Sequence, residues 1–144
     1  MINLLPGLDT TAAALTAERT RMDVVGQNIA NANVTRGVDG RPYQRQQVVF
    51  ETVLGRALQA GRGPAAQAQS VQVSRIQSDP SPPRMVYNPG HPDADGNGMV
   101  SMPNINVHEE MVDLIGASRA FEANLAALKT ARSLAMQTLS IGKR

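Results

Sequence analysis

The stretch MVDLIGASRAFEANLAALKT, residues 111–130, sets the fold class of this chain of 144 residues. Its apolar side chains recur alternately every third and fourth residue, which is the spacing of a coiled-coil heptad. The line consists of Met111, Leu114, Phe121, Leu125 and Leu128, with the polar Ser118 between them. The pattern predicts a long amphipathic helix with a narrow apolar seam.

Local signals predict where this helix begins and ends. Asn106 and Glu109 have the spacing of a capping box, with Asn in place of Ser or Thr. Gly142 suits the position just beyond a helix, so we expect the helix to end near Ile141.

A second helical pattern covers residues 8–32. Apolar side chains recur there every seven residues, and three consecutive alanines favour helix. The predicted seam consists of Leu8, Leu15, Met22, Val25 and Ile29. We expect Asp9 or Thr10 to cap the start of this helix, because both residue types are common N-caps.

The middle of the chain has a different periodicity. Asp39-Gly40 is a turn signal, and alternating or β-branched runs after it indicate strands. The strand candidates are 41–54, 71–76, 84–87 and 98–102. The expected core of this β module consists of Tyr43, Val48, Val49, Phe50 and Tyr87. Small and polar residues over 55–70 predict a flexible loop.

The predicted fold class is therefore α+β. Two long terminal helices pair as a coiled coil, and a small antiparallel β-rich module lies between them. By position in the chain, we expect residues 1–35 and 104–144 to form the two parts of a discontinuous helical domain. Residues 36–103 then form the middle module.

Composition excludes several classes of protein. The absence of cysteine excludes disulfides and thiolate metal sites, and a net charge of +2 gives no broad basic surface for nucleic acid. Only four aromatic residues, two Tyr and two Phe, are available for a core. The N-terminal MINLLPGLDT (1–10) lacks the pattern of a cleaved signal peptide, and no apolar run approaches the roughly 20 residues of a membrane span.

The candidate chemistry is sparse. DADGNGMVS (93–101) resembles the start of a calcium loop, but Asn104 stands where a bidentate Glu is required. A turn rich in Asp, Asn and Gly explains this stretch without a metal. The two histidines, His91 and His108, lack any ligand or nucleophile pattern. We therefore expect no catalytic residues, no metal and no cofactor, and no enzyme activity.

The two seams allow two interpretations. The helices can pack only on each other inside one monomer. Alternatively, they can join a larger array of helices, because Ala117, Ala120, Ala123 and Ala127 lie on faces beyond the seam. The pattern alone leaves both open.

The stretch GQNIANANVTRG (26–37) places three asparagines at the end of the first helix, although Asn is a mediocre helix former. Asn33 can take the left-handed conformation that ends a helix. The amides of Asn28 and Asn31 can both donate and accept, so they can bond to backbone ends on an adjoining helix.

The chain resembles the flagellar basal-body rod proteins, within the wider rod and hook family. The superfamily pattern is TRMDVVGQNIANANVTRG (20–37). Three further stretches resemble the proximal-rod members, namely GRPYQRQQVVFE (40–51), YNPGHPDADGNGMVSMPNINVHEEMVDLI (87–115) and ASRAFEANLAALKTARSLAMQTLSIGKR (117–144). Met99 and His108 depart from the usual family pattern, which has Tyr and an apolar residue there.

The resemblance implies a structural subunit of the rod, whose terminal helices line its inner tube while the β module lies outside. It implies export through the flagellar type III apparatus without a cleaved signal, and assembly in the periplasm with other rod subunits and copies of itself into a shaft that transmits torque. Neither nucleic acid nor membrane insertion is implied. For polar contacts that fix register, we predict Arg19, Arg21, Glu122 and Lys129. The resemblance also assigns Asn28 and Asn31 to contacts at the joint between helix and β module, either within a subunit or between subunits. Without the resemblance, a stand-alone coiled-coil adaptor or export chaperone would be the main rival.

Overall fold

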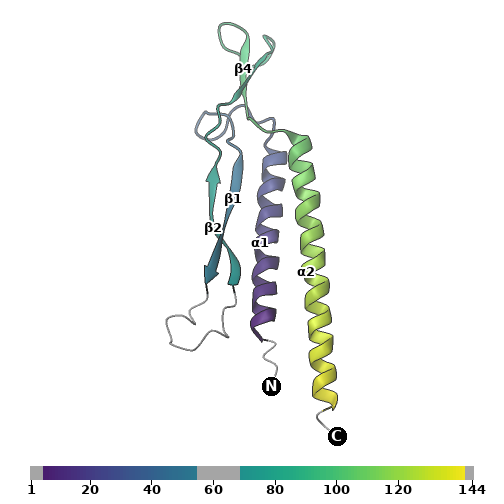
Figure 1. Ribbon diagram of the computed structural model, residues 1–144. Coiled ribbons are helices and arrows are strands. Elements are labelled where there is room, and N and C mark those ends of the chain that lie inside the picture. Colours follow the sequence, from purple (N-terminus) through teal and green to yellow (C-terminus); the bar gives the residue numbers. More distant parts are fainter. Residues whose placement is uncertain (1–4, 55–68, 142–144) are drawn as a thin grey trace. The chain divides into compact units, whose positions relative to one another are not determined.

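The structure is a computed structural model that describes residues 5–54 and 69–141 (Figure 1). In chain order the elements are α1 (Leu5–Ala30), β1 (Gln46–Leu54), β2 (Gln69–Ser78), β3 (Arg84–Tyr87), β4 (Met99–Met102) and α2 (Val107–Ile141). Two helices therefore flank two small sheets, and the predicted α+β class is confirmed.

The chain divides into two compact units. Unit 1 comprises Met1–Thr20, Val49–Arg75 and Ala117–Arg144, and unit 2 comprises Arg21–Val48 and Ile76–Gly116. Each unit takes one part of each helix. Each is described by itself below.

This grouping differs in kind from the expected division into residues 1–35, 36–103 and 104–144. The expected division follows the type of secondary structure along the chain, whereas the units follow contacts between residues. The expected division stays a prediction.

Helix α1 begins earlier than expected. It starts at Leu5, so the predicted cap at Asp9 or Thr10 is wrong. The Thr10 hydroxyl instead donates to the carbonyl of Gly7 at 2.9 Å, inside the helix. Pro6 fits within the first turn because the first backbone N–H groups of a helix have no intrahelical partner.

Helix α1 ends at Ala30, and the chain continues in a turn. The N–H of Val34 donates to the carbonyl of Asn31 at 3.1 Å, which closes this turn. The left-handed conformation predicted for Asn33 is wrong, because every non-glycine residue that the structure describes has negative φ. A hydrogen-bonded turn ends the helix without the steric cost of left-handed Asn.

Helix α2 begins at the predicted cap. The Asn106 side chain accepts a hydrogen bond from the N–H of His108 at 3.1 Å and donates to Glu109 Oε1 at 2.9 Å. The Asn106 carbonyl accepts the first helical hydrogen bond, from Glu110, at 3.0 Å. Helix α2 is described up to Ile141, and residues 142–144, on which the predicted end depends, lie outside the described part of the chain. Neither described helix combines the length and hydrophobicity that crossing a membrane requires.

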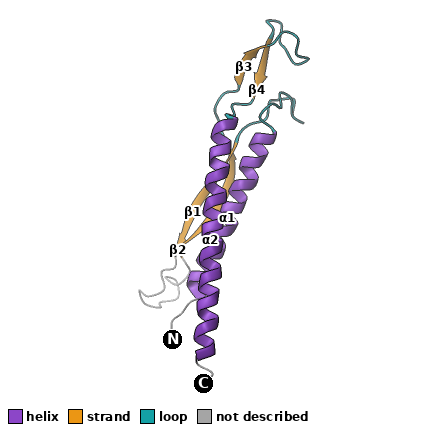
Figure 2. Ribbon diagram, turned by 90° about the vertical axis from the view of Figure 1, so that its right-hand side faces the viewer, coloured by secondary structure: helices purple, strands orange, loops and turns teal. Residues whose placement is uncertain are grey.

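The strands form two separate two-stranded sheets, β1 with β2 and β3 with β4 (Figure 2). In the second sheet the strands run antiparallel, with Arg84 opposite Met102 and Tyr87 opposite Met99. All four predicted strands are present, although the first begins only at Gln46. Of the predicted loop 55–70, residues 55–68 lie outside the described part of the chain, and the last two residues belong to β2.

Buried side chains gather in unit 2. Among the described residues, its buried members are Val24, Val25, Asn28, Ala32, Val100, Pro103, Ile105 and Glu110. In the described part of unit 1, Ala17 and Ala117 are buried. Unit 2 therefore holds most of the buried side chains within the described residues, and two of them, Asn28 and Glu110, are polar.

Two residues predicted for the β-module core are exposed. Tyr87 is 70% exposed and Phe50 is 39% exposed, so their assignment to the core is wrong. Side chains alternate between the faces of a strand, and Val86 and its partner Val100 occupy the covered face of β3 and β4. Tyr87 lies on the other face. The remaining predicted core residues, Tyr43, Val48 and Val49, are half-buried.

The predicted seam residues differ in burial. Val25 is buried, whereas Met111 is 49% exposed. The half-buried ones are Leu8, Leu15, Met22, Ile29, Leu114, Phe121, Leu125 and Leu128. Most of the seam is thus partly covered within the chain itself, and its role in a coiled coil stays a prediction.

Replacement of Gly98 by alanine should destabilise the fold. Gly98 has a φ of 75°, and an added Cβ would lie 3.0 Å from Cε2 of Tyr87 and 3.1 Å from Cβ of Pro89. Left-handed backbone and close contact together should lower the free energy of unfolding by about 1–3 kcal/mol, measured by urea titration. Gly96→Ala is the matched control, because no atom lies within 4 Å of its added Cβ. Equal urea concentrations at the unfolding midpoints of Gly98→Ala and Gly96→Ala would contradict the prediction.

Candidate functional site

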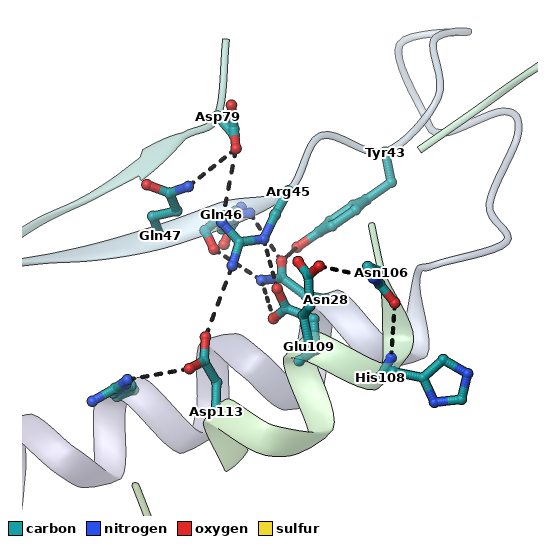
Figure 3. A network of polar contacts seen from close by, with 12 residues as sticks. Asn28, Tyr43, Arg45, Gln46, Gln47, Asp79, Asn106, His108, Glu109 and Asp113 are labelled. Atoms are coloured by element: carbon teal, nitrogen blue, oxygen red, sulfur yellow. Dashed lines mark hydrogen bonds and ion pairs between the residues drawn. The ribbon is translucent and has the colours of Figure 1, made fainter. Parts of the chain in front are cut away.

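Asn28, near the end of α1, is the centre of a buried polar network in unit 2 (Figure 3). Its side chain is only 1% exposed. Nδ2 donates to the carbonyl of Gln46 at 2.9 Å and to Oε2 of Glu110 at 3.0 Å. Oδ1 accepts from the N–H of Gln46 at 2.9 Å and from the Tyr43 hydroxyl at 3.1 Å. These four hydrogen bonds use the full capacity of an amide side chain.

The two bonds between Asn28 and Gln46 resemble a pairing between strands. Gln46 is the first residue of β1, and both its backbone N–H and its carbonyl bond to the Asn28 amide. A side chain near the end of α1 thus satisfies the backbone where β1 begins.

Glu110 lies in the first turn of α2 and is also 1% exposed. Oε1 accepts a hydrogen bond from Nε of Arg45 at 2.6 Å, and Oε2 accepts the bond from Asn28. A buried carboxylate is costly unless it is paired and hydrogen-bonded. Glu110 meets both conditions, because one of its partners is a cation and the other is a neutral donor.

More exposed ion pairs surround this centre. Arg45 Nη1 lies 3.8 Å from Asp79 Oδ2, and Nη2 lies 4.0 Å from Asp113 Oδ2. Asp113 Oδ1 in turn lies 3.5 Å from Nη2 of Arg21. Asp79 also accepts a hydrogen bond from Gln47 at 3.0 Å (Figure 3). Each of these partly exposed ion pairs contributes little to the free energy of folding. Most of the network's contribution to stability therefore comes from the contacts of the buried Asn28 and Glu110.

Tyr43 enters the network through its hydroxyl. Burial raises the pKa of Tyr43 above its ordinary value, and the nearby Glu110 carboxylate raises it further. The hydroxyl therefore stays protonated at neutral pH and donates to Asn28.

Asp79 is held in its charged form. Hydrogen bonds from Ser81, first from its side chain and then from its backbone, lower the pKa of Asp79, and Arg45 and Gln47 act in the same direction. Partial burial opposes this shift. The Asp79 N–H also donates to the Arg45 carbonyl at 2.7 Å, so this segment is attached to the start of β1 by its backbone too.

The three asparagines expected at the joint have different surroundings. Asn28, expected to bond to backbone, bonds to Gln46 within the same chain. The side-chain amide of Asn31, the first residue after α1, donates to the carbonyl of Gln27 in the last turn of that helix at 2.8 Å. Asn33 is exposed. Only Asn28 is thus part of the buried network.

The residues predicted to fix register lie mostly on the surface. Arg21 bonds to Asp113 of the same chain, whereas Arg19, Glu122 and Lys129 are exposed. Their contacts with neighbouring subunits stay predictions.

Sequence reasoning missed the charged half of the network. It placed none of Glu110, Arg45 and Asp79 in a polar network. One signal was available, because Glu110 lies four residues before Leu114 and seven before Ala117 on α2. That spacing puts a carboxylate on the buried face of the helix, where it needs a partner.

The calcium-like loop uses its carboxylates for local structure. Asp93 Oδ2 accepts a hydrogen bond from the Thr35 hydroxyl at 2.8 Å. Asp95 Oδ1 accepts from the N–H groups of Asn97 and Met99, both at 2.8 Å. Within residues 5–54 and 69–141, no group of three or more acidic, His or Cys side chains is arranged to hold a metal ion.

A cleft of about 280 Å³ adjoins the network in unit 2. Its walls include Pro42, Tyr43 and Pro83, together with the charged residues Arg41, Arg45 and Asp79. Arg45 and Asp79 form an ion pair within the network, so these charged walls of the cleft join elements of the fold.

Arg45→Met should be strongly destabilising, because it leaves the Glu110 carboxylate buried without its cation. We expect the free energy of unfolding to fall by about 3–5 kcal/mol in urea titrations. Arg41→Met, at an exposed position nearby, is the control and should change it by less than about 0.5 kcal/mol. Similar losses in the two variants would contradict the role assigned to Arg45.

Asp79→Asn should remove part of the acid sensitivity of the fold. Because the pKa of Asp79 is lowered in the folded state, its charge stabilises the protein above the unfolded pKa, near 4, and this contribution is lost as pH falls through the folded pKa. The difference in unfolding free energy between wild type and Asp79→Asn should therefore be constant from about pH 5 to 7 and shrink below about pH 4. A difference that stays constant down to pH 2.5 would contradict the assignment.

Two family models match the chain, and both describe rod proteins. One, described as flagella basal body rod protein, matches residues 8–37, and the other, described as flagellar basal body rod FlgEFG protein C-terminal, matches residues 97–141. The first includes Asn28, and the second includes Glu110.

Curated relatives cover nearly the whole chain. A flagellar basal-body rod protein FlgC of Yersinia enterocolitica is 41% identical, over 99% of this chain and 100% of that protein. The FlgC protein of Bacillus subtilis is 40% identical over 94% of this chain and 96% of its own length. The FlgC protein of Salmonella typhi is 39% identical over 97% and 98%, respectively. The chain therefore belongs to the family of flagellar basal-body rod proteins, and within it to the FlgC type.

Proposed function

We propose that this chain is a structural subunit of the proximal rod of the bacterial flagellar basal body. In this role it assembles in the periplasm with other rod subunits and with copies of itself, and the assembled shaft transmits torque. The observation that carries the proposal is the identity of about 40% to FlgC rod proteins over nearly the full length of the chain. The role requires contacts between subunits and no chemical reaction.

The exposed apolar surface of α2 supports assembly. Leu134, Met136, Leu139 and Ile141 are each between 54% and 74% exposed in the last turns of the helix. Nearer its start, Val112 and Ile115 are 69% and 53% exposed. Extended exposed apolar surface on a helix is typical of a partner-binding face.

The terminal helices are proposed to pair as a coiled coil. Leu8 and Leu15 of α1, and Phe121, Leu125 and Leu128 of α2, are half-buried. Partial cover fits seam positions that become fully buried once neighbouring helices are present. The exposed Arg19, Glu122 and Lys129 are then available for polar contacts that fix the register between subunits.

Delivery is proposed to occur through the flagellar type III export apparatus without a cleaved signal peptide. The support is the resemblance to exported rod proteins and the N-terminal sequence, which lacks the charged and apolar pattern of a secretory signal.

Leu125→Asp tests the proposed assembly. Half-burial of Leu125 allows the single chain to tolerate a carboxylate there, whereas an assembled seam would bury it unpaired at a cost of about 3–5 kcal/mol. We expect the variant to be expressed but non-motile in soft agar, and electron microscopy of its basal bodies to show no completed rod.

Leu125→Met is the control, because it keeps an apolar side chain of similar volume and should preserve motility. Normal motility of Leu125→Asp would contradict the assignment of Leu125 to the coiled-coil seam. Loss of motility in both variants would show that the position tolerates no change, and would not support a seam.

A further inference from the structure

We propose that Asn28, Arg45, Gln46 and Glu110 form a latch, in which the first turn of α2 can dock only after the start of β1 has docked on the end of α1. All four residues belong to unit 2. The proposal concerns the order of folding within the free subunit and goes beyond the proposed role in the rod.

The first step joins the end of α1 to the start of β1. Asn28 bonds to both backbone groups of Gln46 and to the Tyr43 hydroxyl, at distances of 2.9 to 3.1 Å. These partners lie only 15 and 18 residues along the chain, so the loop that must close is short. The contact requires nothing from α2, and it leaves one Asn28 N–H still unsatisfied.

The second step depends on that remaining donor. Glu110, 82 residues from Asn28 along the chain, accepts its N–H at 3.0 Å. The other carboxylate oxygen accepts from Arg45, the residue directly before Gln46. When β1 docks, it therefore brings the Arg45 cation to Glu110. In the same step it holds the Asn28 side chain in the orientation in which its free N–H can donate to Glu110.

The burial of Glu110 makes the order of these steps matter. If α2 docked first, a carboxylate that is 1% exposed in the final structure would be buried without Arg45, its cationic partner, and beside an Asn28 side chain that β1 has not yet oriented. Val24 and Val25 of α1, and Ala32 in the turn that follows it, are buried as well. Polar groups in such dry surroundings are costly to leave unpaired, so α2 stays undocked until β1 is in place.

Asn31 provides a matched control for the test. It has the same side chain as Asn28 and lies three residues further along, but its amide donates only to Gln27 of the same segment, at 2.8 Å. Asn31→Ala therefore reproduces the loss of an asparagine at the end of α1 without removing any contact to β1 or α2.

The test measures amide hydrogen exchange in the full-length free subunit by NMR. In Asn28→Ala, the amides of residues 110–113 should exchange about tenfold faster or more than in wild type, whereas Asn31→Ala should change them by less than about twofold. Equal effects of the two variants would overturn the latch and leave Asn28 with a local role in its own helix.

The Glu110→Met variant tests whether the charge of Glu110 causes the faster exchange that we expect in Asn28→Ala. Glu110→Met keeps the volume but removes the carboxylate that must be paired. In that background, Asn28→Ala should accelerate exchange at residues 110–113 by less than about threefold. An undiminished effect would overturn the proposal.

The comparison of Asn28→Ala in the wild-type and Glu110→Met backgrounds still tests the latch if Asn28→Ala alone does not fold. The latch then requires that the double variant Asn28→Ala/Glu110→Met folds, measured by its urea unfolding transition. Failure of the double variant to fold, while Glu110→Met alone folds, would refute the latch. Because these measurements use the free subunit, their outcome is separate from any defect in motility or rod assembly.

Discussion

The packing of unit 2 depends on one buried carboxylate, that of Glu110, which must be paired with other polar groups. Glu110 can be buried in the first turn of α2 only because Arg45 and Asn28 reach it from the start of β1 and the end of α1. Three segments far apart in the sequence must therefore meet at one point. A neutral residue at position 110 would relax that requirement, and apolar packing alone would specify the arrangement less strictly.

The periodic and local features of this fold could be predicted from its sequence. Heptad spacing indicated both helices, and Asn106 capped α2 as expected because a cap depends on residues within one turn. The network around Glu110 depends on partners 65 and 82 residues away, which no local pattern specifies. The errors at Asn33 and Tyr87 have a related cause, since a residue type allows a conformation or a burial state and its neighbours decide which one occurs.

The distribution of buried residues fits a subunit with one self-sufficient part and one part that relies on partners. Among the residues that the structure describes, unit 2 contains most of the buried side chains, including the polar Asn28 and Glu110, whereas apolar side chains along the second half of α2 remain exposed. A shaft that transmits torque needs both properties. Each subunit must keep a defined internal geometry, and it must also present apolar surface to its neighbours.

The pairing between Asn28 and Gln46 also bears on aggregation. The first residue of a strand ordinarily presents an N–H and a carbonyl that can template a strand of another molecule. Here the Asn28 amide occupies both groups. A side chain of the same chain therefore blocks one end of a strand edge that could otherwise pair with a strand of another molecule.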